Sequence, residues 1–158
     1  MTSTACWRGY IAQYQVVDGQ LKLHDLSLNH RPRVVPGPRR LEPPSLNGVQ
    51  AVREDEMFFC DWGFSNVNLP LGYTGGVVIG RDFIDDLSTH RGFDPVWEYR
   101  RVQELVFDKG RLVETNDASN DLDRRRIELK SQGAFDDAAK LGAIDTKMIE
   151  GLRRSYFR

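Results

Sequence analysis

The sequence predicts an α+β protein in which an antiparallel β-rich body, residues 5–116, is followed by C-terminal helices in residues 117–158. This class is indicated by an Asp-Gly turn between two alternating runs near the amino terminus, a second hairpin around Asp108-Lys109-Gly110, and helical spacing after Asn116. The chain of 158 residues is 40% hydrophobic, which suffices for a core without disulfides or a metal. We therefore expect a single domain over residues 1–158.

The first hairpin is predicted together with its register. Asp18-Gly19 favours a type I′ turn, because this turn needs a positive φ at both central residues. The residues placed directly opposite each other are then Val17 and Gln20, Val16 and Leu21, Gln15 and Lys22, and Tyr14 and Leu23. This register gathers the apolar side chains of both strands on one face, as a one-sided antiparallel sheet requires. The apolar phase shifts by one position after Leu23, which predicts a β-bulge near His24-Asp25.

The middle of the chain is predicted to alternate between loops and short strands. Residues 30–48 are expected to form an extended loop, since they hold five of the 7 prolines and proline removes backbone donors. Residues 49–64 are strand-like, and a glycine-rich turn region leads into a short strand at residues 77–79. Arg81 begins a predicted short helix, with Asp82 as its N-cap.

The second hairpin allows two turn lengths. A two-residue loop, Lys109-Gly110, pairs Phe107 with Leu112, whereas a three-residue loop sets Glu104 directly against Glu114. Because like charges opposite each other destabilise a sheet, we prefer the two-residue loop.

The carboxyl-terminal segment is predicted to be helical. Asn120, followed by Asp123, is a candidate start of the first helix, and Gly133 is a candidate stop. Helical spacing resumes over residues 135–142, and an apolar stripe predicts an amphipathic helix over residues 144–156.

Charge and composition limit the classes of partner. The chain carries 22 basic and 23 acidic side chains, for a formal net charge of −1, and its acidic excess falls in the middle of the sequence. This near-neutral charge argues against nucleic acid as a binding partner, because each phosphate contact needs a compensating cation. No apolar run reaches the roughly 18 residues of a membrane span, and the first residues lack the pattern of an export signal. Since 2 cysteines are too few for a disulfide framework, we expect a cytoplasmic protein.

Several segments carry a resemblance to known proteins. Residues 6–23, with a W-R-G-Y opening, an alternating strand and an Asp-Gly turn, resemble the start of a group of small bacterial proteins of unassigned function. Residues 71–83 and 102–112 are similar to the second half of those proteins. The resemblance implies a β-rich fold and a bacterial origin, and it implies no catalytic residue. Residues 129–141 resemble the short helical hairpin of bacterial excision-repair proteins, which docks onto a partner's like hairpin, although Gly133 departs from that pattern.

No group of residues has the spacing of a catalytic or metal site. The glycines between residues 72 and 80 are not followed by the Lys-Ser/Thr of a phosphate loop, and the 3 histidines lack the i, i+4 spacing of metal ligands. Cys6 and Cys60 lie in apolar, aromatic strands, where a thiol is expected to be buried and inert. We therefore assign no catalytic residue, no metal ligand and no cofactor, and enzymatic activity is not the preferred hypothesis.

The preferred hypothesis is a module that binds another protein through its strand surface and an arginine-rich loop. A small immunity or antitoxin-type inhibitor is one concrete form of it, and a homo-oligomer is compatible with the sequence. Aromatic and arginine side chains dominate protein-binding hot spots, although most of the aromatic residues are expected to be core. The candidate partner-binding residues are Trp7, Arg8, Tyr10, Asp61, Trp62, Tyr73, Arg31, Arg33, Arg39 and Arg40.

Two alternatives stay open. A small-ligand-binding protein or an enzyme would have its pocket between the sheet and the C-terminal helices, with Tyr73, Arg81, Asp82 and Trp62 as ligand-binding residues. RNA binding would use the arginines of the loop over residues 30–48.

Overall fold

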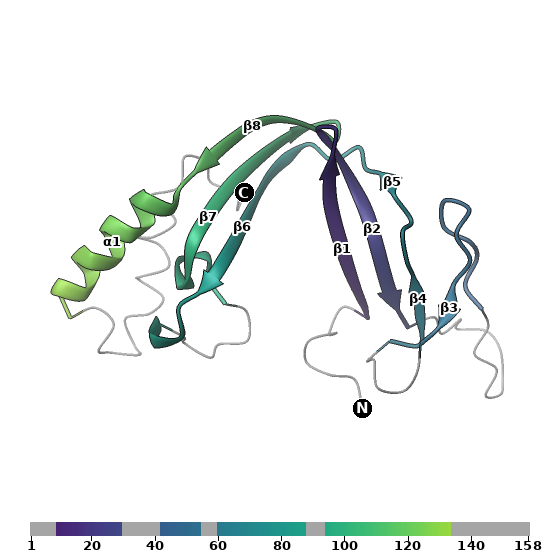
Figure 1. Cartoon of the computed structure of the whole chain (residues 1–158), viewed down its shortest axis with the longest axis horizontal. Helices are drawn as coiled ribbons and strands as arrows, with labels where there is room; N and C mark the ends of the chain where they lie inside the picture. Colours follow the sequence, from purple (N-terminus) through teal and green to yellow (C-terminus); the bar gives the residue numbers. More distant parts are fainter. Residues whose placement is uncertain (1–8, 30–41, 55–59, 88–93, 134–158) are drawn as a thin grey trace. The chain divides into compact units, whose positions relative to one another are not determined.

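The computed structural model describes residues 9–29, 42–54, 60–87 and 94–133 of the chain. The chain divides into two compact units: unit 1 comprises Met1–Tyr73 with Lys109–Arg111, and unit 2 comprises Thr74–Asp108 with Leu112–Arg158. Each unit contains strands (Figure 1). Each unit also has its own hydrophobic cluster. The expectation of a single domain stays a prediction.

The described elements are antiparallel strands, one α-helix and two short 3-10 turns. The strands are β1 (Tyr10–Val17), β2 (Gln20–Leu28), β3 (Val52–Arg53), β4 (Trp62–Phe64), β5 (Leu69–Pro70), β6 (Gly75–Phe83), β7 (Tyr99–Asp108) and β8 (Arg111–Asp117), and the helical elements are η2 (Asp85–Leu87), η3 (Val96–Glu98) and α1 (Ser119–Ser131). A mainly antiparallel β structure with a helix after it confirms the predicted α+β class at this level. The further helices predicted over residues 135–142 and 144–156 lie outside the described residues.

β1 and β2 form the predicted hairpin. The two residues of the Asp18-Gly19 turn have φ angles of 52° and 72°, as a type I′ turn requires. Val17 lies opposite Gln20 and Tyr14 lies opposite Leu23, so the predicted register is confirmed.

The predicted β-bulge is also present. Tyr14 lies opposite Leu23, whereas the preceding residue, Gln13, lies opposite Asp25. His24 is therefore the extra residue, and it belongs to β2. Because of this insertion, the leucines on both sides of the bulge project from the same face of the hairpin.

The other edge of β2 pairs with three segments in succession. Leu26 lies opposite Phe64 of β4, Lys22 opposite Pro70 of β5, and Gln20 opposite Arg111, which belongs to unit 1. A hydrophobic cluster covers this part of the leucine face; its members are Ala51, Phe64 and Val67, with Leu26, Leu28, Leu46, Val49, Trp62 and Leu69 packed against them.

The end of the proline-rich segment is a tight turn rather than an extended loop. Asn47 and Gly48 have φ angles of 50° and 81°, and Leu46 and Val49 exchange backbone hydrogen bonds of 2.9 and 3.0 Å across them. The Asn47 side chain donates to the carbonyl of Val67 at 2.7 Å, which fixes the turn on unit 1. The expectation of an extended loop is therefore wrong at residues 46–48, and residues 30–41 lie outside the described residues.

The turn of the second hairpin is part of unit 1. Lys109 and Gly110 have φ angles of 46° and 82° between the ends of β7 and β8, which confirms the preferred two-residue loop. The carbonyl of Gly110 accepts a hydrogen bond from the backbone N–H of Leu21 at 2.8 Å, and its N–H donates to the carbonyl of Tyr73 at 2.6 Å. A Cβ atom at Gly110 would lie 1.8 Å from the carbonyl oxygen of Leu71, so only glycine fits this turn.

In unit 2, β7 lies between β6 and β8. β6 pairs with β7 from Gly75 opposite Phe107 to Phe83 opposite Tyr99, which makes it much longer than the predicted strand at residues 77–79. The prediction that Asp82 caps a helix is wrong, because Asp82 lies inside β6 with a left-handed φ of 62°. A 3-10 turn, η2, follows only after Ile84.

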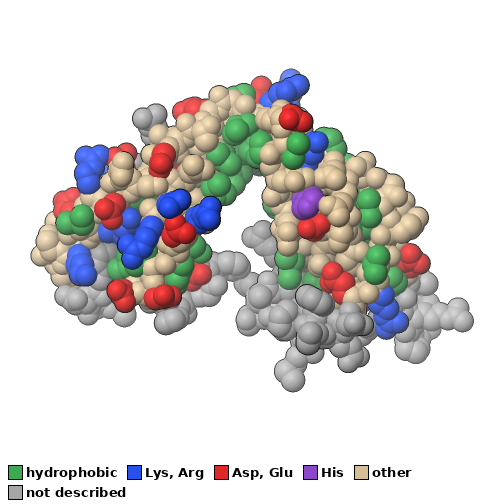
Figure 2. Space-filling model, in the orientation of Figure 1, with side chains coloured by type: hydrophobic (Ala, Val, Ile, Leu, Met, Phe, Trp, Pro, Cys, Tyr) green, Lys and Arg blue, Asp and Glu red, His purple; other side chains and the backbone are tan. Residues whose placement is uncertain are grey.

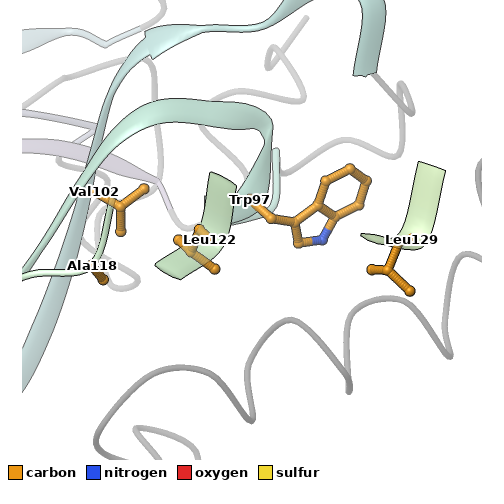
Figure 3. Close-up of a cluster of buried hydrophobic side chains, with 5 residues drawn as sticks. All are labelled: Trp97, Val102, Ala118, Leu122 and Leu129. Carbon is orange, nitrogen blue, oxygen red and sulfur yellow. The ribbon is translucent and has the colours of Figure 1, made fainter. Parts of the chain in front are cut away.

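Helix α1 packs against β7 and encloses the core of unit 2. The cluster consists of Trp97, Val102, Ala118, Leu122 and Leu129, and Figure 3 shows the indole of Trp97 between the side chains of Leu122 and Leu129. Leu122 and Leu129 are seven positions apart, so they project from the same side of the helix. This pair of contacts holds α1 on the segment that leads into β7.

A buried arginine links α1 to the same segment. Arg126 donates hydrogen bonds of 3.1 Å to the carbonyls of Trp97 and Tyr99, and it forms an ion pair of 3.2 Å with Asp123. Its guanidinium therefore supplies donors to the two backbone carbonyls that flank Glu98, and the bond to the Trp97 carbonyl is buried.

The ends of α1 agree with the sequence at the stop and differ at the start. Gly133 has a φ of 63° and donates to the carbonyl of Lys130 at 3.0 Å, as expected for a helix-terminating glycine. Asn120, the predicted cap, lies inside the helix, which begins one residue earlier. The N–H of Ser119 is instead bound by the carboxylate of Asp117 at 2.9 Å.

We expect Gly110→Ala to destabilise unit 1 by about 3 kcal/mol or more, because the new methyl group overlaps the Leu71 carbonyl and the residue must keep a positive φ. Gly19→Ala is the matched control, since Gly19 has the same left-handed φ but open space around its Cβ position. It should cost only about 1–2 kcal/mol. Urea denaturation of the two variants measures the difference, and equal losses would contradict the described packing of the turn.

Candidate functional site

The strongest candidate site is an apolar strip along β1. The even-numbered residues of β1 project from the same face as the β2 leucines that lie opposite them. Three of these side chains are exposed, Tyr10 by 44%, Tyr14 by 58% and Val16 by 38%. We call Tyr10, Tyr14 and Val16 the β1 strip.

The β1 strip continues an apolar face that is covered elsewhere. Val16 lies opposite Leu21 and Tyr14 opposite Leu23, yet these two leucines are only 9% and 8% exposed. The leucines lie on the central strand of unit 1, whereas β1 pairs with β2 alone among the described strands. The apolar face is therefore buried at its centre and open along β1. Figure 2 shows hydrophobic side chains at the surface of unit 1 among polar ones.

Two of the predicted partner-binding residues meet on this face. Tyr10 lies opposite Leu28 and Leu28 lies opposite Trp62, so the three side chains form one row across the sheet. Trp62 is half-buried, and its indole nitrogen is buried with no hydrogen-bond acceptor in the described part of the chain. Trp62 thus lies in the same row as Tyr10, a member of the β1 strip.

The other predicted partner-binding residues do not gather with this pair. The backbone N–H of Asp61 donates to the side chain of Asn29 at 3.0 Å, so Asp61 anchors the entry to β4. Tyr73 is exposed, and its carbonyl holds the Gly110 turn. Trp7, Arg8, Arg31, Arg33, Arg39 and Arg40 lie outside the described residues.

The predicted ligand-binding residues are divided between the units. Trp62 and Tyr73 belong to unit 1, whereas Arg81 and Asp82 belong to unit 2. Asp82 forms an ion pair of 2.9 Å with Arg101 and one of 3.7 Å with Arg81, which lie opposite each other on β6 and β7. The carboxylate thus relieves the repulsion between two facing arginines.

This charged cluster is balanced rather than basic. Arg101 also interacts electrostatically with Asp117, so two acidic side chains accompany the two arginines. Both guanidinium groups are largely in water, with Arg81 exposed by 80% and Arg101 by 71%. Figure 2 shows acidic and basic side chains interleaved in the same way on unit 2. The cluster therefore has the charge of a structural ion-pair network.

A second polar cluster surrounds the β-bulge of unit 1. The side-chain carbonyl of Asn68 accepts a hydrogen bond of 2.5 Å from Gln15 and lies 3.4 Å from Nδ1 of His24. The carboxylate of Asp25 accepts from the N–H of Asn66 at 2.9 Å. Asn66 and Asn68 have φ angles of 57° and 51°, a conformation that asparagine tolerates. These bonds fasten the loop between β4 and β5 to the bulge.

The buried ionisable groups of unit 2 belong to its fold. Glu98, Glu104 and Arg126 are buried, and the Glu104 carboxylate accepts a hydrogen bond from the Asn116 side chain. Burial raises the pKa of Tyr99, and the nearby carboxylates of Asp94 and Glu98 raise it further. Within residues 9–29, 42–54, 60–87 and 94–133, no group of three or more His, Cys, Asp or Glu residues is arranged to hold a metal ion. None of the described helices is long and apolar enough to span a membrane.

No protein-family model, no curated protein and no solved structure matches this chain. The resemblance of residues 6–23 to small bacterial proteins therefore stays an observation on the sequence.

Sequence reasoning missed two of the three members of the β1 strip. Tyr14, its most exposed member, and Val16 were assigned to the apolar face of the hairpin but to no site, as was Ile11 on the other face, which is exposed by 42%. The alternation of apolar and polar residues along a strand indicates which face of the sheet a side chain occupies. Whether that face is covered depends on whether the strand lies at the edge of the sheet, and this is decided by pairing between segments that are distant in the sequence.

The interactions of the Asp117 carboxylate with Ser119 and Arg101, at the start of α1, can be tested through their effect on stability. Hydrogen bonds from the Ser119 side chain and backbone, and the charge of Arg101, lower the pKa of Asp117, although desolvation opposes them. A lowered folded-state pKa stabilises the protein above the usual aspartate value of about 3.9, and this contribution disappears as pH falls through the folded-state pKa. We therefore expect Asp117→Asn to lower the unfolding midpoint at neutral pH and to narrow its difference from wild type in acid. Thermal melts over a pH series measure this, and a difference that does not change with pH would contradict the assignment.

Proposed function

We propose that this protein acts by binding another protein through the β1 strip. The observation that carries the proposal is the exposure of Tyr10, Tyr14 and Val16 on β1, while Leu21 and Leu23 on the same face of the hairpin are buried. Contiguous exposed apolar side chains mark interaction surfaces more often than isolated ones do. Tyrosine is enriched in binding hot spots, because its ring supplies contact area and its hydroxyl remains hydrogen-bonded.

The chemistry of the strand supports the same proposal. β1 has the sequence YIAQYQVV, which contains no charged side chain and no proline. Proteins commonly protect an exposed strand edge from unwanted pairing with lysine, proline or a bulge on that strand. The bulge of this hairpin lies on β2 instead, so β1 presents a regular, uncharged edge. Such an edge favours addition of a strand from a partner.

The two alternatives stay predictions. The small-ligand hypothesis assigns the binding to four residues. Trp62 and Tyr73 belong to unit 1, and Arg81 and Asp82 belong to unit 2. RNA binding draws on arginines of residues 31–40, which lie outside the described residues.

We expect a photoreactive phenylalanine analogue at Tyr14 to form discrete covalent adducts with another protein chain in cells of the native host. The same analogue at Ile127 is the matched control, because Ile127 is exposed by 64% but lies on α1 of unit 2. Mass spectrometry of the adducts identifies the captured chain. Equal adduct patterns at the two positions, or none at Tyr14, would reject the proposal.

With the captured chain purified, Tyr14→Lys should weaken binding at least about tenfold, or about 1.4 kcal/mol, because it places a charge in an apolar contact. Ile127→Lys should leave the affinity unchanged. Calorimetric titration measures both variants, and an unaffected Tyr14→Lys variant would remove the β1 strip from the interface.

A further inference from the structure

One hydrogen bond indicates which residues of β1 direct their backbone N–H and carbonyl groups away from β2. The carbonyl of Gly9 accepts from the N–H of Asn29 at 3.1 Å, so Gly9 directs its backbone groups toward β2. Successive residues of a strand direct these groups to opposite sides. The bulge does not interrupt this alternation, because the extra residue belongs to β2. The even-numbered residues, from Tyr10 to Val16, therefore direct their N–H and carbonyl groups away from β2.

The same even-numbered residues carry the β1 strip. An incoming antiparallel strand must match them with residues whose backbone groups also point outward. A second copy of β1 satisfies this condition when even-numbered residues lie opposite even-numbered residues, which is the arrangement of a two-fold axis perpendicular to the sheet. Both copies then present their apolar strips on one face of a continuous sheet.

One symmetric register uses the strand most fully. With Gln13 opposite its own copy, Tyr10 lies opposite Val16 and Ala12 opposite Tyr14, so the pairing extends from one end of the strip to the other. Centring the pairing on Ala12 leaves Val16 without a partner in β1, and centring it on Tyr14 leaves Tyr10 without one, because the strand spans Tyr10–Val17. Aromatic residues opposite β-branched or apolar ones are favourable cross-strand pairs.

Charge does not oppose this pairing. β1 carries no ionisable group other than its tyrosines, so two copies meet without like charges opposite each other. The residues that would meet on the second face are Gln13 with Gln13 and Ile11 with Gln15, which are uncharged.

We propose that the chain forms a two-fold symmetric dimer by antiparallel pairing of β1 with β1 of a second copy, centred on Gln13. This inference rests on the proposed function, because it names a second copy as the protein that occupies the β1 strip. The pairing converts the open edge of unit 1 into the centre of a larger sheet.

The full-length Gln13→Cys variant tests the register. Residue 13 forms a non-hydrogen-bonded pair with its own copy, where Cα atoms lie roughly 4.5 Å apart, within the roughly 4.4–6.8 Å that a disulfide spans. Under mild oxidation we expect a dimer linked between the two copies of residue 13, identified by peptide mass spectrometry. Gln15→Cys is the matched control, since residue 15 lies opposite Ile11 and should not link to itself. Equal linking of the two variants, or no linking at residue 13, would overturn the register.

Sedimentation equilibrium of the wild-type chain tests the dimer itself. We expect a reversible dimer that Tyr14→Lys weakens by about tenfold or more and that Ile127→Lys leaves unchanged. Circular dichroism confirms that both variants are folded. A wild-type chain that stays monomeric at every concentration overturns the self-pairing. If that monomer is nevertheless captured at Tyr14 by a different protein, the proposed function stands; if nothing is captured, both fail.

Discussion

Unit 1 depends on the backbone pairing of β2. This strand is hydrogen-bonded to β1 along one edge and to β4, β5 and Arg111 along the other, so four separate segments are ordered by one strand. β4 and β5 have three and two residues, too few to form a stable sheet without a longer partner. The leucines of β2 supply the hydrophobic contacts that keep these short strands in place. The same arrangement leaves β1 at the edge, which is why the apolar face of the hairpin is open there.

Unit 2 is stabilised differently, because helix α1 packs against one face of its strands. The indole of Trp97 fills the space between Leu122 and Leu129, and Arg126 satisfies the carbonyls on either side of Glu98. Burying a guanidinium removes it from water, a cost that its hydrogen bonds and its ion pair with Asp123 offset. At the surface, Asp82 balances the charges of the facing arginines of β6 and β7.

The sequence-based predictions were accurate where a structure depends on residues close together in the sequence, and less accurate where it depends on pairing between distant segments. The β1–β2 hairpin was predicted with its turn, register and bulge, because all three depend on residues close in sequence. Lys109-Gly110 and Gly133 were predicted for the same reason. Asp82 was placed in a helix because its acidic neighbours resemble a helix start, yet pairing with β7 determines its conformation. For the site, Tyr10 and Trp62 were chosen as aromatic residues, whereas the exposure of Tyr14 depends on which segments pair with β2. Such pairing between distant segments leaves no local pattern in the sequence.

The position of the Gly110 turn has a consequence for how the gene can be divided. The chain leaves unit 1 after Tyr73, returns for Lys109–Arg111 and leaves again, so no continuous stretch of codons encodes unit 1. A polypeptide ending at Tyr73 would lack the acceptor for the Leu21 N–H and the donor for the Tyr73 carbonyl. Recombination or limited proteolysis at that boundary would therefore deprive unit 1 of Lys109–Arg111, whereas residues 74–158 contain all of unit 2.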